Sequence, residues 1–388
     1  MKKILLCFLI SLSSVLAIDV TVADGLKTVE VFTAGEGDYP HFRIPTIVCT
    51  RKGTLLAFAE ARFIKDDHGR NDIVMKRSTD NGQTWSKLIV LHADKELVMV
   101  NPSPVVLRNG KIILMYETFP HGYHARLGRH HKMMDDGYGK ERTQRLLMLS
   151  STDDGQSWSK AKDLTKVARA ETKIIQAGSP ANGIQLRKGK YKGRIVMPLF
   201  LTQKINSRKR TWQNAVLYSD DNGKNWQRGE YVPYGEAGAC NETTIAELSN
   251  GDIMMNSRPA SAKMRAVSTS KDGGVTWSPY KWDKTLAGRT CNIGFLRQSY
   301  KKNRLVFCNN FNNSNIRKNG TIRISYDDGQ TWPVQKQLVP GLFGYCQLTR
   351  LKNGDIGIIY EPFHSPREEW SLHYMTLPLK WIEAKESQ

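Results

Sequence analysis

Short runs rich in apolar residues recur along the whole chain, separated by polar turns. Several runs begin just after an Asn-Gly pair, at residues 109–110, 250–251 and 353–354, and this pair is a strong short-range signal for a β-hairpin. The pattern therefore predicts short strands joined by tight turns. These strands are expected at residues 111–117, 145–150, 194–200, 214–219, 252–258, 304–309, 321–325, 355–361 and 372–379.

An octapeptide of the form Ser-x-Asp-x-Gly-x-x-Trp occurs five times, with 51 to 73 residues between successive Asp positions. Its Asp can accept backbone N–H bonds within its own turn, its Gly supplies a positive φ, and its Trp can pack on a neighbouring sheet. We interpret the copies as structural turns and not as calcium loops of the EF-hand type, because none has the closing Glu at the twelfth position. The copies are residues 78–85, 151–158, 219–226, 270–277 and 325–332.

The spacing of these turns predicts the fold. About four strands per repeat are typical of a β-propeller, whose radial repetition leaves no long sheet edge exposed. Five turns and one blade without the motif predict an all-β, six-bladed β-propeller. We expect the strand at 372–379 to close the ring with the segment at 28–32.

The composition excludes a disordered or fibrous chain, because 40% of the 388 residues are hydrophobic and 24% are charged. The chain has 57 Lys and Arg against 37 Asp and Glu, a formal net charge of +20, which favours an anionic partner. The basic residues are scattered without a run of five, so we expect no nucleic-acid partner.

The first 17 residues have the pattern of a secretion signal, with Lys2 and Lys3 before an apolar run and Ala17 at the expected cleavage site. We therefore predict a leader at 1–17, a single catalytic domain at 18–388, and a secreted or periplasmic protein. No later apolar stretch is long enough to span a membrane. The five cysteines beyond the leader lack zinc-site spacing and form no even-numbered disulfide framework, so we expect mostly buried thiols.

The Phe-Arg-Ile-Pro sequence at 42–45, followed by the repeated Asp boxes, resembles the exo-α-sialidases (neuraminidases) over essentially the whole mature chain. The resemblance implies a site at the ring centre with an arginine triad for the sugar's carboxylate, a Tyr/Glu nucleophilic pair and an Asp acid/base. It implies no metal and no organic cofactor. Sialidases with a tyrosine nucleophile depart from the two-carboxylate scheme of most glycosidases.

Arg43, Arg258 and Arg317 match the triad positions, and Arg62 matches a further pocket arginine of the family. Three guanidiniums on one carboxylate make physical sense, because each offers planar, charge-assisted donors and keeps its proton. Arg323 is assigned to the surface or the blade instead.

Asp67 is the predicted acid/base, in an exposed loop where Asp66 competes for the role. Tyr345 matches the nucleophile, and Glu242 matches the base that takes its proton. Glu247 competes with Glu242 and is otherwise expected at an exposed hairpin position. Asn101 falls where the family often places a residue near the sugar's amide.

These features favour a retaining exo-α-sialidase that acts as a monomer on terminal sialic acid of glycans or glycoproteins. Intramolecular transfer, hydrolysis of a related 2-keto sugar acid and non-catalytic glycan binding stay open as alternatives. The segment 118–144 is long, polar and rich in histidine, and is expected as a rim loop, with a metal site through His121 and His124 or His130 and His131 as the alternative.

Overall fold

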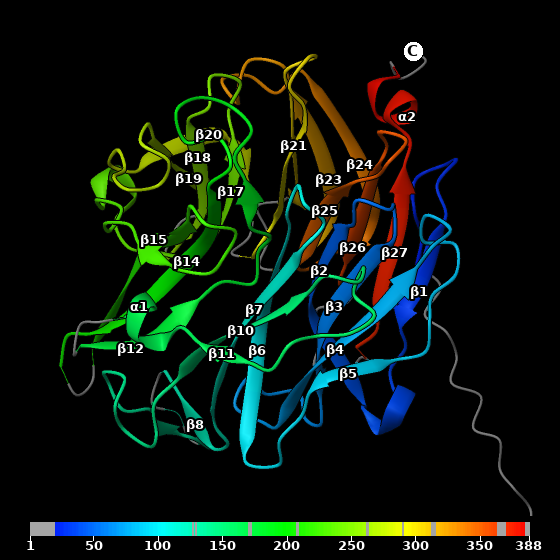
Figure 1. Cartoon of the computed structure of the whole chain (residues 1–388). Helices are drawn as coiled ribbons and strands as arrows, with labels where there is room; N and C mark the ends of the chain where they lie inside the picture. Colours follow the sequence, from blue (N-terminus) through cyan, green and yellow to red (C-terminus); the bar gives the residue numbers. More distant parts are fainter. Residues whose placement is uncertain are drawn as a thin grey trace, which may run out of the picture.

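The computed structural model of the chain describes residues 20–125, 128, 130–169, 173–206, 209–260, 264–288, 291–311, 316–362 and 370–384, so the predicted leader lies outside the described residues. Strands dominate (Figure 1), and the predicted all-β class is confirmed. No helix in the described ranges has the length and hydrophobicity needed to cross a bilayer. The helical segments are η1 (Glu36–Asp38), α1 (Thr165–Ala168), η2 (Gly235–Ala237) and α2 (Leu379–Glu383).

Most strands form antiparallel sheets in which chain neighbours pair with one another. One sheet contains β17 (Cys240–Glu247), β18 (Ile253–Pro259), β19 (Met264–Ser270) and β20 (Lys281–Ala287). The next contains β21 (Gly294–Ser299), β22 (Arg304–Asn310), β23 (Lys318–Ser325) and β24 (Val334–Leu342). A third contains β12 (Ile174–Gly178), β13 (Ile184–Gln185), β14 (Ile195–Lys204), β15 (Arg210–Ser219) and β16 (Gln227–Arg228), with β12 and β13 both paired to β14.

The largest sheet has eight strands and divides into two antiparallel halves. The halves are joined between β4 and β6 by one parallel residue pair, Asn71 with Val98. The first half contains β2 (His41–Cys49), β3 (Leu55–Arg62), β4 (Asn71–Ser78) and β5 (Ile89–His92). The second contains β6 (Leu97–Val106), β7 (Ile112–Pro120), β10 (Arg145–Ser151) and β11 (Lys162–Asp163). The short pair β8 (Tyr123–His124) and β9 (Lys132–Met133) stands apart.

The last sheet joins the two ends of the described chain. It contains β25 (Cys346–Arg350), β26 (Ile356–Tyr360), β27 (Leu372–Leu377) and β1 (Thr28–Phe32). The pairing of β1 with β27 sets Thr28 opposite Met375. The predicted closure by the segment at 28–32 is therefore confirmed.

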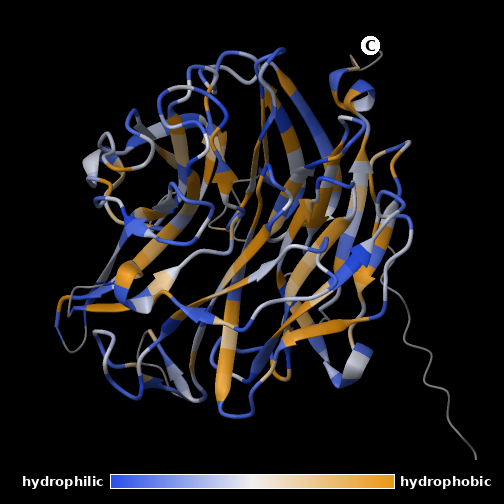
Figure 2. Cartoon of the chain, in the orientation of Figure 1, coloured by the Kyte–Doolittle hydropathy of each residue, from blue (hydrophilic) through white to orange (hydrophobic). Residues whose placement is uncertain are grey.

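The sheets have a propeller-like arrangement around a central axis. Their inner strands contact one another in a closed ring, from β2 to β6, β13, β17, β21, β25 and back to β2. Apolar side chains fill the space between neighbouring sheets, as where Ile113 and Leu146 meet Met197 and Leu217. Figure 2 shows this as hydrophobic colour along the strands and hydrophilic colour in the outer loops.

Each Asp box forms the predicted turn, between the third strand of a sheet and its outer strand. In the first box, Ser78 Oγ donates to Asp80 Oδ1 at 2.7 Å, and the Thr84 N–H donates to the same oxygen at 3.0 Å. Asn81 has a φ of 59° and Gly82 a φ of 88°, so two consecutive residues take the left-handed conformation. The same Ser–Asp and Ser–Gly contacts recur in the other four boxes.

Candidate functional site

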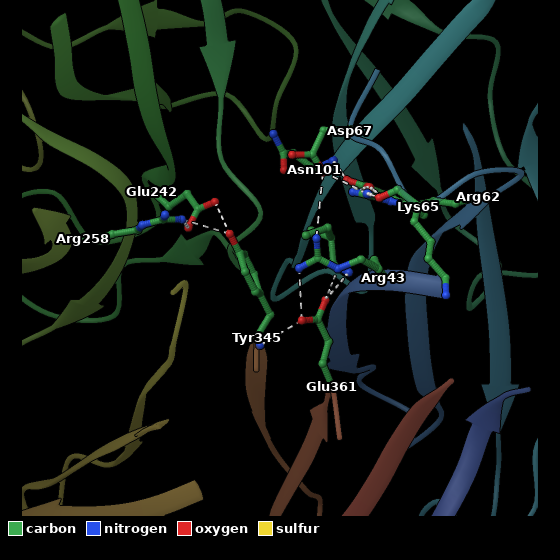
Figure 3. A network of polar contacts seen from close by, with 11 residues as sticks. Arg43, Arg62, Lys65, Asp67, Asn101, Glu242, Arg258, Tyr345 and Glu361 are labelled. Carbon is green, nitrogen blue, oxygen red and sulfur yellow. Dashed lines mark hydrogen bonds and ion pairs between the residues drawn. The ribbon is translucent and has the colours of Figure 1, made fainter. Parts of the chain in front are cut away.

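A pocket of about 720 Å³ opens at one end of the inner strands. All eight predicted site residues line it: Arg43, Arg62, Asp67, Asn101, Glu242, Arg258, Arg317 and Tyr345. They come from several sheets and their connecting loops, and from positions up to 302 residues apart, between Arg43 and Tyr345. The closed ring therefore assembles in one place side chains that the sequence scatters. Figure 3 shows the network of polar contacts around these side chains, with all of them but Arg317 labelled.

Tyr345 and Glu242 meet at the centre of this pocket. The Tyr345 hydroxyl donates to Glu242 Oε1 at 2.5 Å, and Arg258 Nη1 lies 2.8 Å from Glu242 Oε2 and 3.1 Å from the Tyr345 oxygen. Tyr345 precedes β25, while Glu242 lies where the register of β17 with β18 shifts between Cys240 and Thr243. Such an irregularity in the pairing can turn a side chain away from the face that regular alternation along the strand would give it, which is consistent with the position of Glu242 in the pocket.

The environment of Tyr345 keeps its phenol protonated. Burial and then the negative charge of Glu242 raise the pKa of Tyr345 well above its usual range, while the charges of Arg258 and Arg317 oppose that rise. The phenol therefore keeps its proton at ordinary pH. Its hydrogen bond directs that proton to the Glu242 carboxylate, which is placed to accept it.

All three arginines of the predicted triad contact Tyr345. Arg258 donates to its hydroxyl, and the guanidinium carbons of Arg43 and Arg317 lie 5.3 and 5.1 Å from its ring centre. Guanidiniums at this range interact favourably with an aromatic face. The site thus brings the three cations together around one residue, beside the open volume of the pocket.

Arg43 is held by a carboxylate that the sequence did not reveal as part of the site. Its Nε and Nη2 donate to Glu361 Oε1 and Oε2 at 3.0 and 3.2 Å, and the backbone N–H of Ile44 donates to Oε1 at 3.1 Å. Ile44 has a φ of 53°, within the interruption of the β2–β3 register between Arg43 and Thr46. Glu361 is buried at the end of an apolar strand, and a charge in such a position indicates a partner.

Asp67 lies on the loop between β3 and β4 with its side chain 46% exposed, as predicted for a loop carboxylate. Its Oδ1 is 2.9 Å from Arg62 Nη1 and 3.9 Å from Arg43 Nη1. Partial loss of water around this carboxylate at the pocket would by itself raise its pKa, but the charges of Arg62 and Arg43 outweigh that effect and hold the pKa of Asp67 well below its usual range. Asp66, the competing residue, faces His68 at 3.9 Å and does not line the pocket.

A chain of buried polar contacts supports the other wall. Glu60 binds the Arg62 Nε at 2.9 Å and accepts the backbone N–H of Asn101 at 2.8 Å. The Asn101 side chain donates to Glu117 Oε1 at 2.6 Å, and Gln176 donates to Glu117 Oε2 at 2.7 Å. Burial raises the pKa of Glu117 to about 7. Glu60, Glu117 and Gln176 were missed because each is one polar residue in an otherwise strand-like run.

The rest of the pocket lining combines apolar and aromatic side chains with polar ones such as Thr202, Arg210 and Asn241. Such surfaces with a few placed polar groups are typical of sites for small ligands. The apolar lining residues are Val100, Phe119, Ala125, Phe200, Ile205 and Trp212.

Comparisons with known proteins agree with this geometry. The family model for the BNR repeat-like domain matches residues 53–358, which is most of the chain. A sialidase from Micromonospora viridifaciens is 32% identical over 90% of this chain, and one from Bacteroides fragilis is 30% identical over 89%. The chain belongs to the sialidase family with BNR repeats. Among solved structures, the Hadza microbial sialidase Hz136 superimposes with a TM-score of 0.78 at 25% identity, covering 92% of this chain.

The sialidase-family relatives are longer than this chain. The chain spans 53% of the Micromonospora sialidase, 64% of the Bacteroides sialidase and 69% of the Hz136 chain.

Against this family background, two competing residues lie away from the pocket. Glu247 sits at the far end of β17, where it accepts the Tyr300 hydroxyl and the backbone N–H of Arg187 and Lys188. It is buried, so the expectation of an exposed hairpin position was wrong, because the Tyr300 loop of the next sheet covers it. Arg323 is buried within its blade and donates to Asn309 at 3.1 Å.

The histidine-rich segment reaches the pocket through His124, which lines it. The rings of His68 and His131 lie 4.5 Å apart between centres, and those of His124 and His131 lie 5.3 Å apart. The described residues contain no group of three or more metal-type ligands with suitable geometry. The segment is therefore placed as a rim element beside the Asp67 loop, and residues 126–127 and 129 lie outside the described ranges.

Proposed function

We propose that this protein is a retaining exo-α-sialidase that removes terminal sialic acid from glycans or glycoproteins. The observation that carries the proposal is the hydrogen bond of 2.5 Å between Tyr345 and Glu242, in a pocket where three arginines contact the same tyrosine. Family membership supports the same activity.

Substrate recognition would begin with the carboxylate of the sugar. Arg43, Arg258 and Arg317 offer charge-assisted donors, and planar guanidiniums suit a carboxylate better than ammonium groups do. The apolar and aromatic side chains in the pocket lining suit the N-acyl group that sialic acids carry.

In the first step, the Tyr345 oxygen attacks the anomeric carbon while Glu242 takes the phenolic proton. An anionic nucleophile would be repelled by the substrate's own carboxylate, whereas a neutral phenol approaches without that repulsion and gains nucleophilicity as its proton leaves. Arg258 contacts both side chains, so it can stabilise the negative charge that leaves Glu242 and builds up on the Tyr345 oxygen as the proton moves.

Asp67 supplies the other proton. It protonates the glycosidic oxygen as that bond breaks, and then takes a proton from the water that displaces Tyr345, to which Glu242 returns its proton. The low pKa of Asp67 means that the carboxylate must gain a proton when substrate binds. The substrate carboxylate competes with Asp67 for Arg43, and this competition weakens the interaction that keeps Asp67 ionised. The two displacements retain the anomeric configuration, and no step uses a metal ion or organic cofactor.

Product identification tests the proposal. A fluorogenic sialoside and α2,3- and α2,6-linked glycans should release sialic acid, first as the α-anomer when followed by NMR. Release of the β-anomer first would overturn retention. An internally closed product would indicate intramolecular transfer. Cleavage restricted to a different 2-keto sugar acid would show that this sugar acid, and not sialic acid, is the substrate. Binding without turnover would leave only a glycan-binding role.

The proposal includes a six-bladed propeller. The single residue pair between β4 and β6 supports counting the eight-stranded sheet as two blades, and the ring of inner strands supports six in all. An experimental structure with a different number of radial sheets would overturn this count.

We also propose export to the periplasm or the exterior as a monomer. The Lys2–Lys3 segment, the apolar run and Ala17 support cleavage of a leader. Sequencing the N-terminus of the exported protein and measuring its mass by light scattering test the two points.

A further inference from the structure

A second cavity, of about 370 Å³, lies at the opposite end of the inner strands from the pocket that contains Tyr345 and Glu242, which we call the sialidase pocket. On β17, Glu242 lines the sialidase pocket and Glu247 lines this second cavity. Because a strand rises about 3.3 Å per residue, the two positions are roughly 17 Å apart along the axis. The second cavity is therefore a separate site at the other mouth of the ring.

Four exposed arginines surround this mouth. Each belongs to a different segment that follows or ends an inner strand, after β2, β6, β13 and within β25. None of the four forms an ion pair with another described residue. They are Arg51, Arg108, Arg187 and Arg350.

The other charged lining residues offset only one of these four charges. The fifth arginine, Arg297, is paired with Asp328. The one carboxylate in the lining is Glu247, which already accepts the Tyr300 hydroxyl and two backbone N–H groups. Counting the Arg297–Asp328 pair as neutral and Glu247 as one negative charge, the mouth retains an excess of about three positive charges, and such a concave cluster attracts anions.

Two residues that line the cavity, Gln298 and Asn182, each have a buried side-chain oxygen without a donor among the described residues. Gln298 is 5% exposed, its amide nitrogen donates to the Gly354 carbonyl at 2.7 Å, and its Oε1 has no partner among the described residues. Asn182 donates to the Ile47 carbonyl at 2.8 Å, and its Oδ1 likewise has no partner in the part of the chain that the structure describes. An amide oxygen accepts only from a donor such as a hydroxyl, and buried acceptors are normally satisfied.

We propose that this cavity binds an acidic sugar, meaning a hydroxyl-bearing monosaccharide unit that carries a carboxylate or a phosphate. The guanidiniums take the anionic group, and the amide oxygens accept from hydroxyls. The volume falls within the range of small-molecule sites. This binding is independent of sialoside cleavage, because the reacting groups lie at the other mouth.

Cys49 offers a local reporter of occupancy. It lines the cavity, and it is the one cysteine among residues 20–384 as described that is not buried. N-ethylmaleimide should therefore label it first, at alkaline pH because burial raises its pKa. The probes are D-glucuronic acid and D-glucose 6-phosphate, with D-glucose and inorganic phosphate as comparisons.

We expect at least one acidic sugar to slow Cys49 labelling saturably, by about tenfold at about ten times its Kd. Which one protects decides between a carboxylated and a phosphorylated unit. Glucose should not protect, and phosphate alone should protect far less. Equal protection by phosphate, or no saturable protection by either sugar in labelling and in calorimetry, would overturn the proposal.

The double variant Arg108→Gln/Arg350→Gln should lose the protection while keeping sialoside turnover. Arg145→Gln removes one charge from an exposed arginine outside this cavity and should keep the protection. Protection that survives in the double variant would contradict the site. Calorimetric titration of the same variants gives the answer if labelling of Cys49 is too slow to follow.

Discussion

Glu361 and Arg43 form a two-point ion pair, in which Nε and Nη2 of the guanidinium donate to the two carboxylate oxygens at 3.0 and 3.2 Å. The same carboxylate accepts the backbone N–H of Tyr345 at 3.2 Å. One buried side chain therefore orients an arginine of the predicted triad and also the backbone of the predicted nucleophile, which directly precedes β25. Support of this kind is what holds a site within the narrow tolerance that catalysis needs.

Glu361→Gln should lower kcat/KM on sialosides by about 10- to 150-fold, because a charge-assisted hydrogen bond contributes roughly 1.5–3 kcal/mol. Steady-state kinetics measure the loss. Glu383→Gln is the matched control, since Glu383 forms a similar two-point pair with Arg304 far from the pocket. If both variants lost the same activity, the effect would be one of general stability and not of Arg43 orientation.

Arg317→Lys keeps the charge but loses the planar fork, so we expect kcat/KM to fall by roughly 100-fold with a nearly unchanged Tm. Activity assays and thermal denaturation of the same preparation measure the two quantities. Near-full efficiency in this variant would remove Arg317 from the triad.

Asp67→Ala should impair natural glycosides far more than aryl sialosides with acidic phenols, because an acid is needed most when the leaving group is poor. Comparing kcat/KM on the two substrate types gives the ratio. Asp66→Ala is the adjacent control and should affect both types little. A larger effect from Asp66→Ala would move the assignment by one residue.

Tyr345→Phe should fold normally and bind free sialic acid, while its turnover falls by orders of magnitude. Adding Glu242→Ala should cost little more, because groups that act as one unit give non-additive losses. Kinetics of the two single variants and the double variant test this pairing. A 3-fluoro-sialosyl fluoride should label Tyr345 in the wild type, as peptide mass spectrometry would show, and fully multiplicative losses or labelling elsewhere would separate the two residues.

Glu117→Gln should alter the pH dependence of stability. Burial raises the pKa of Glu117 to about 7, above its unfolded value near 4.3, so the unfolded state loses the proton first as pH rises. Wild-type stability from this group therefore falls between about pH 4.3 and 7 and then levels off. The variant should show a smaller fall in Tm over that range, whereas Glu141→Gln, at an exposed site, should follow the wild type.

The turns and the strand order were predictable because each Asp box encodes its own geometry within eight residues. Arg43 and Tyr345 could be proposed for a different reason, because the segments around them resemble the sialidases. The supporting carboxylates could not, because Glu60 and Glu361 look like strand residues until the ring brings their partners to them. The partner of Glu361 lies 318 residues away, and no local pattern encodes that distance.

The pairing of β1 with β27 also constrains how this chain can fold. Thr28 meets Met375 across almost the full length of the described sequence, so the last sheet cannot gain its fourth strand until nearly every residue has left the ribosome. Contacts between residues so far apart in the sequence form slowly. The chain loses conformational entropy when the long loop closes, and the contacts stabilise the structure only after that closure. The sheets that precede the last one in the sequence pair strands that are near neighbours in the chain, so they can form while β1 has no partner strand. Completion of the ring should therefore be the late, rate-limiting event, and loss of either terminal strand should leave a chain whose sheets form but whose pocket does not.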